Sequence, residues 1–165
     1  MSDPSPFFDP STLVDVHLLG LPVKVWASAQ EHVDELLREF SLIAAQIRSE
    51  GGHSEVPVRL IDLIDAVTAE YGGLNTEQEA RLAAAAAAGV PLIDDLLFRI
   101  PPEAADAVMH LGALLDEADA YCSVGDHLLT LASPPVLARF RKWYLDEFTG
   151  QLAGRAPVAW ADFQG

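Results

Sequence analysis

A run of apolar residues between positions 26 and 47 constrains the fold of this chain more than any other feature. Successive members are alternately three and four residues apart, the a/d spacing of a helix with one narrow apolar seam. The intervening positions are mostly charged or polar, so the pattern predicts one long amphipathic helix over about residues 23–49, ended by Gly51 and Gly52. The seam consists of Trp26, Ala29, Val33, Leu36, Phe40, Ile43 and Ile47.

Helical spacing of apolar residues recurs in later segments of the chain. Asn75 and Ser133 stand where side chains that cap helix N-termini are expected. Pro101 disfavours helical backbone at the residue before it, but residues 91–100 still show helical spacing and are predicted as a short helix. The further helices are expected over residues 57–71, 75–88, 91–100, 102–124 and 134–150.

Residues 12–19 differ from the rest because apolar and polar side chains alternate there, as in a strand with one buried face. Residues 127–131 are a candidate second strand. The sequence therefore predicts a mainly α fold, a bundle of four to five helices with at most one short two-stranded β pair. It is expected to comprise a flexible tail over 1–11, a single helical domain over 12–152 and a C-terminal tail over 153–165.

Charge excludes several classes of partner. The chain has 25 Asp and Glu but only 10 Lys and Arg, a formal net charge of −15. Nucleic acids and anionic membrane surfaces require clustered cations, so neither is an expected partner. There is no apolar run of about 18 residues that could span a membrane, and the first residues lack the features of a secretory signal. A cytoplasmic location is expected.

The sequence contains no pattern typical of a catalytic, cofactor or metal site. Its one Glu-x-x-His run, Glu50 to His53, includes two glycines and is expected to lie in a loop. Glycine-rich phosphate loops and nucleophile-elbow motifs are absent. Cys122, the single cysteine, falls on the apolar track of a helix, where a thiol acts as a small hydrophobic group. No catalytic residue, cofactor or metal is therefore predicted.

The remaining features indicate interaction with another protein. Residues 90–128 are strongly acidic, whereas the last helix carries Arg139, Arg141 and Lys142. This polarity fits either internal complementarity or an acidic face for a basic partner. The first-helix seam fits either the inside of a bundle or a dimer interface. The candidate interaction residues are Trp26, Val33, Leu36, Phe40, Ile43, Arg139, Trp143 and Trp160.

Two stretches resemble proteins of a known kind. They are LPVKVWASAQEHVDELLREFSLIA at 21–44 and LTLASPPVLARFRKWYLDEFTGQL at 129–152. Together they resemble small uncharacterised helical proteins of actinomycetes that are associated with partner-switching regulation of sigma factors. The resemblance implies a regulatory context. It carries no catalytic motif, and the ATP-binding boxes of the kinase-type anti-sigma factors are absent, so no residue role follows from it.

The sequence as a whole predicts a non-enzymatic, cytoplasmic regulatory or adaptor protein that acts by binding another protein. Homodimerisation through the first helix is a further expectation. The alternative is a helical bundle that binds a small molecule or a metal, including an enzyme of unfamiliar type. That alternative requires a sizeable pocket with convergent polar groups, such as two or three of the residues His17, His32, His110 and His127.

Overall fold

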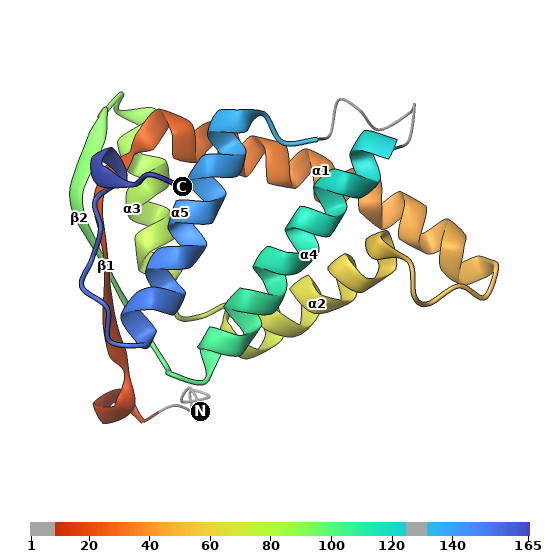
Figure 1. The fold of residues 1–165 in the computed structure, drawn as a ribbon, viewed down its shortest axis with the longest axis horizontal. Helices are drawn as coiled ribbons and strands as arrows, with labels where there is room; N and C mark the ends of the chain where they lie inside the picture. Colours follow the sequence, from red (N-terminus) through yellow and green to blue (C-terminus); the bar gives the residue numbers. More distant parts are fainter. Residues whose placement is uncertain (1–8, 125–131) are drawn as a thin grey trace, which may run out of the picture.

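The computed structural model describes residues 9–124 and 132–165, and this part of the chain contains five α-helices and one two-stranded antiparallel sheet (Figure 1). The mainly helical fold class expected from the sequence is confirmed. Two short 3-10 turns, η1 and η3, lie near the two ends of the chain. In chain order the elements are η1 (Pro10–Thr12), β1 (Val14–Pro22), α1 (Val23–Ser49), α2 (Val56–Tyr71), α3 (Thr76–Ala87), β2 (Leu92–Ile100), α4 (Ala104–Val124), α5 (Pro135–Leu152) and η3 (Trp160–Asp162).

The prediction of a short helix over residues 91–100 is wrong, because this segment is β2 and pairs with β1. Both strands change the face that they bury partway along. Gly20 adopts a φ of +65°, and the side chains of Leu18 and Leu21 on either side of it both enter the core. Ile93 and Leu96 do the same in β2. Buried residues three apart instead of two apart imitate the spacing of a helix. The other candidate strand, residues 127–131, lies outside the described residues.

The helix starts also differ from prediction in detail. Helix α4 begins at Ala104, after Pro101 and Pro102, and α5 begins at Pro135. Neither predicted cap forms a capping hydrogen bond. Asn75 instead donates from Nδ2 to Oε1 of Glu79 at 3.0 Å, and Ser133 lies outside α5, whose N-cap is Pro134.

One hydrophobic cluster, called here the sheet core, forms where α5 packs on the inner face of the β1–β2 sheet. The sheet and the C-terminal segment lie together at one end of the molecule (Figure 1). Edge-to-face aromatic pairs run through this cluster and extend to Trp160 of η3. The buried members are Val16, Leu18, Leu21, Val23, Leu82, Ile93, Leu96, Phe98, Ile100, Ala104, Phe140, Trp143 and Phe148.

A second cluster, the helix core, forms where α1, α2 and α4 meet at the other end of the molecule. Helix α1 takes part in both clusters. Its 27 residues extend about 40 Å at roughly 1.5 Å per residue, long enough to run from one to the other. The buried members are Leu36, Phe40, Leu60, Leu114, Leu115, Ala118 and Cys122.

Side-chain amides satisfy backbone groups at both edges of the small sheet. Gln151 accepts from the backbone N–H of His17 and donates to its carbonyl, both at 2.8 Å. Gln78 of α3 donates to the carbonyl of Leu97 on β2, also at 2.8 Å. These bonds replace neighbouring strands at edges that would otherwise leave backbone polar groups unpaired.

Candidate functional site

The apolar seam of α1 faces inward. Leu36 is 2% exposed and Phe40 is 0% exposed, and both belong to the helix core. Trp26 and Ile43 are half-buried and pack against the sheet core and the helix core, respectively. Val33 lines a small cavity between α1 and α5. In this structure the central seam residues Leu36 and Phe40 are therefore buried by other elements of the same chain.

The three interaction candidates near the C-terminus contact the chain's own last residues. Trp143 is fully buried and donates from Nε1 to the carbonyl of Val158 at 2.8 Å. Arg139 donates to the carbonyl of Phe163, and its guanidinium carbon lies 4.7 Å from the centre of the Trp160 ring. These side chains hold residues 158–163 against the sheet core.

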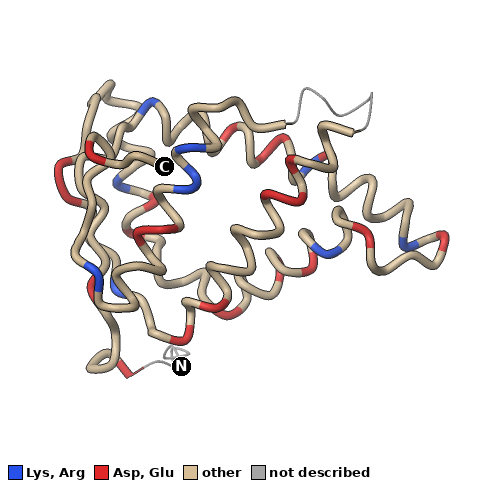
Figure 2. The backbone as a smooth tube through the Cα atoms, viewed as in Figure 1, with Lys and Arg blue, Asp and Glu red and all other residues tan. Residues whose placement is uncertain are grey.

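Several of the basic residues form ion pairs with acidic residues of the same chain. Arg141 on α5 lies 2.9 Å from an oxygen of Asp116 and 2.7 Å from an oxygen of Asp119, both on α4. Further ion pairs join Arg48 to Asp62, between α1 and α2, and Arg59 to Glu117, between α2 and α4. Part of the charge polarity seen in the sequence is thus internal complementarity. Figure 2 shows that acidic positions are spread along the chain and are not gathered on one element.

An acidic stripe remains on the outer face of α1. We define it as Glu31, Glu35 and Glu39, three exposed glutamates four residues apart, together with Leu42, which is 66% exposed. Within residues 9–124 and 132–165, no cation lies within ion-pair distance of these glutamates, and Arg38 on the same helix forms no ion pair with them. The stripe therefore presents uncompensated negative charge beside an exposed apolar side chain.

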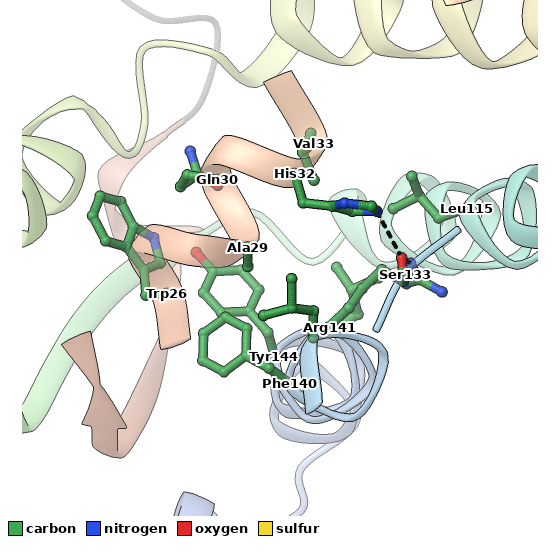
Figure 3. Close-up of a pocket in the computed structure, with 12 residues that line it drawn as sticks. Trp26, Ala29, Gln30, His32, Val33, Leu115, Ser133, Phe140, Arg141 and Tyr144 are labelled. Atoms are coloured by element: carbon green, nitrogen blue, oxygen red, sulfur yellow. Dashed lines mark hydrogen bonds between the residues drawn. The ribbon is translucent and has the colours of Figure 1, made fainter. Parts of the chain in front are cut away.

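A polar cluster connects α1, α4 and α5 with the segment before α5, and Figure 3 draws His32, Ser133 and Arg141 of this cluster. The hydroxyl of Ser133 lies 3.2 Å from Nε2 of His32, 2.9 Å from Oδ1 of Asp119 and 3.1 Å from Nη1 of Arg141. The backbone N–H of Ser133 also donates to Asp119, at 3.1 Å. The sequence gives no signal for this cluster, because its members are far apart along the chain and Ser133 stands where a helix cap is expected.

The order of contacts in the polar cluster differs from that of a hydrolytic triad. In a triad the carboxylate binds the imidazole, which in turn accepts the serine proton. Here Asp119 binds the serine directly and accepts from both its hydroxyl and its backbone N–H. The arrangement anchors the chain just before α5, with Arg141 bridging to α4.

A cavity of about 130 Å³ adjoins the polar cluster between α1 and α5. Figure 3 shows Trp26, Ala29 and Val33 on one side and Phe140 and Tyr144 on the other. Its walls are mainly apolar. Its volume is below the range of about 300–1,000 Å³ that is typical of small-molecule sites.

Cys122 is fully buried in the helix core. Burial, with a smaller contribution from the charge of Asp119, raises the pKa of its thiol to about 11. A nucleophilic or metal-binding cysteine needs the thiolate, which this environment disfavours.

The histidines that the alternative function requires do not form a metal site in the described part of the chain. His17 pairs with Asp95 across the sheet at 3.0 Å, whereas His32 belongs to the polar cluster. Among the described residues, no group of three histidine, cysteine or acidic side chains is placed to hold a metal ion. His127 lies outside those residues.

Comparison of the chain with protein families, curated proteins and solved structures finds no match. Among the described residues, none of the helices combines the length and the apolar character that a membrane span requires. The fold and its surface define a mainly helical acidic protein with two hydrophobic cores, an inward-facing seam and an acidic stripe on its longest helix.

Proposed function

We propose that this chain is a non-enzymatic regulatory or adaptor protein that binds a basic surface of another protein through the acidic stripe of α1. The observation that supports this is the unrelieved repulsion within the stripe. Like charges four residues apart on a helix destabilise it by about 0.2–0.5 kcal/mol per pair. Glu31, Glu35 and Glu39 form two such pairs, and a cationic partner surface removes this repulsion.

The burial of the opposite face of α1 supports the same proposal. Val23 belongs to the sheet core, and Leu36 and Phe40 belong to the helix core, so α1 is held in place near its start and along its middle. A charged stripe on an anchored helix is already ordered before a partner arrives, which lowers the entropic cost of association. Leu42 supplies an apolar contact next to the charges.

The resemblance of residues 21–44 and 129–152 to actinomycete proteins associated with sigma-factor regulation suggests the kind of partner. We place that partner in a partner-switching network, as a protein with a basic docking face. Electrostatic complementarity of this kind mainly sets specificity and the rate of association, both of which suit a partner that must exchange.

The test is a charge reversal of the stripe, with Glu31, Glu35 and Glu39 each replaced by Lys. The matched control reverses Asp65, Glu77 and Asp162, three exposed acids on other elements, and so changes the net charge equally. Proteins captured by the wild type are identified by mass spectrometry, and the specific partner is purified and titrated by calorimetry. The stripe variant should bind at least about tenfold more weakly, and wild-type binding should weaken with salt.

Equal loss of affinity in the stripe variant and in the control would mean that net charge alone is responsible. Unchanged binding by the stripe variant would assign the partner to another face. Circular dichroism of both variants verifies that the helices remain folded.

A further inference from the structure

A cavity of about 340 Å³ lies at the junction of the two cores and is partly open to solvent. Elements α2, α3, β2, α4 and α5 all contribute to its wall. Phe98, Ile100 and Phe148 come from the sheet core, and Leu111 packs against the helix core. The cavity is therefore a gap in the packing between the sheet core and the helix core.

The size and lining of this cavity are typical of a ligand site. Its volume falls within the range of about 300–1,000 Å³ for small-molecule sites and is about twice that of a cavity that holds benzene. Apolar walls that face solvent are unfavourable, since they keep apolar surface in contact with water. An apolar body of roughly two rings, or a medium-length alkyl chain, would remove that surface from water.

The polar side chains around this cavity are acidic or carry hydroxyl or amide groups. Glu79 and Asn75 line it and are hydrogen-bonded to each other, and Tyr71 and Tyr144 line the same cavity. The described residues that line the cavity include no Lys or Arg. A carboxylate or phosphate head group would therefore meet repulsion from Glu79 with no compensating cation.

Two tyrosines that line the cavity have raised pKa values, mainly because they are buried and to a smaller extent because acidic groups lie near them. The pKa of Tyr71 is raised first by burial, then by a hydrogen bond to Glu70 and by the charges of Glu70, Glu103 and Asp106. The pKa of Tyr144, on another wall of the cavity, is raised by burial and by the charge of Glu79.

We propose that this cavity binds a small amphiphile whose apolar body fills the space between the cores and whose ammonium head group pairs with the carboxylate of Glu79. Glu79 provides the opposite charge and can accept hydrogen bonds from the ammonium group. The apolar walls then contribute affinity, and the carboxylate sets the preference for the charge of the head group.

The test compares three probes that share one alkyl chain: octylamine, octanol and octanoate. Each is titrated into the full chain at pH 7 by isothermal calorimetry. Octylamine should bind most tightly, octanol less tightly and octanoate most weakly, with at least about a tenfold difference between the amine and the carboxylate. Failure of all three to bind, or equal binding of amine and carboxylate, would overturn the proposal.

Two pairs of variants separate this site from general attraction to an acidic protein. Glu79→Gln should reduce octylamine binding to the level of octanol, whereas Glu77→Gln, exposed on the same helix outside the cavity, should have no effect. Ala107→Leu narrows the cavity and should weaken all three probes, whereas Ala120→Leu, on the outer face of α4, should not. Equal effects within either pair would contradict the assignment.

Val67→Phe, on the α2 wall, repeats the narrowing test from another helix if Ala107→Leu does not fold. Reversal of charge along the acidic stripe should leave amphiphile binding unchanged. The two proposals can therefore fail independently.

Discussion

The sheet core and the helix core are held together by different kinds of interaction. Among the described residues the sheet core has thirteen buried members and the helix core has seven. Aromatic rings pack edge to face through the sheet core, where Phe98 meets Phe148 and Trp143 meets Trp160. The helix core is mainly aliphatic, and among the described residues it has one aromatic pair, between Phe40 and Tyr121.

Polar contacts increase the contrast between the two cores. Glu147 is 1% exposed and accepts hydrogen bonds from Gln151, Arg155 and the backbone N–H of Val158, so the sheet core has a buried polar clamp. Around the helix core, the ion pairs Arg48–Asp62 and Arg59–Glu117 lie at the surface, where such pairs contribute little stability. We therefore expect the sheet core to act as the scaffold and the helix core to open locally at a lower free energy.

The largest effect is expected from Trp143→Ala in the sheet core. Removal of a fully buried indole costs about 3–5 kcal/mol, and here it also leaves the carbonyl of Val158 without its donor. Urea denaturation followed by fluorescence and by circular dichroism should show the whole domain losing stability in one transition. Trp143→Phe keeps a ring and should lose less. A loss confined to the last residues would show that the sheet core is not the scaffold.

Leu114→Ala in the helix core is expected to cost about 2–4 kcal/mol. Native-state hydrogen exchange distinguishes the local effect expected of Leu114→Ala from the global effect expected of Trp143→Ala. Amides of α2 and α4 should exchange faster, whereas those of β1 and β2 keep most of their protection. Equal acceleration in the strands would mean that the two cores unfold as one unit.

Glu147→Gln tests the polar clamp. The carboxylate receives three hydrogen bonds, and the replacement amide leaves Arg155 without its anion, so we expect a loss of about 1–3 kcal/mol, moderated because Arg155 is partly exposed. Chemical denaturation gives the free energy, with Asp146→Asn on the exposed neighbouring position as control. A neutral result would assign the attachment of residues 158–163 to Trp143 and Arg139 alone.

The smallest effect concerns Cys122 in the helix core. Its pKa rises from 9.0 to about 11 because burial disfavours the thiolate. When folding raises the pKa of a group, the protonated group stabilises the folded state, and this contribution is complete at pH values below the pKa of the unfolded state. The contribution is lost as the pH rises from the unfolded-state pKa to the folded-state pKa. We expect about 1 kcal/mol of unfolding free energy to be lost between pH 8 and 10 on this account. Cys122→Ala should show a correspondingly shallower decline, and equal slopes would contradict the assignment.

Helix α1 could be predicted to its exact bounds because its signal is local. The a/d spacing, the intervening charges and the closing glycines all lie within one segment. The strand over residues 92–100 could not be predicted from its own sequence. Its buried side chains have helical spacing because the strand changes its buried face opposite Gly20 of β1. That change exists only when the two strands pair.

The candidate sites follow the same division. The acidic stripe can be seen in the sequence as glutamates four residues apart. The polar cluster cannot, because His32 and Ser133 are 101 residues apart in the chain and meet only through packing of α1 against α5. The cavity at the junction of the cores draws its lining from five elements, and no single segment carries its pattern.

The order of residues alone determined the helical class, the length of α1 and the surplus of negative charge, since each depends on near neighbours in the chain or on simple counts. Only the three-dimensional arrangement decided that the seam faces inward, that β1 pairs with β2 and that Trp143 and Arg139 hold the chain's own C-terminal segment. Those choices depend on which distant surfaces exclude water together, and burial is a property of the whole assembly of elements rather than of any one of them.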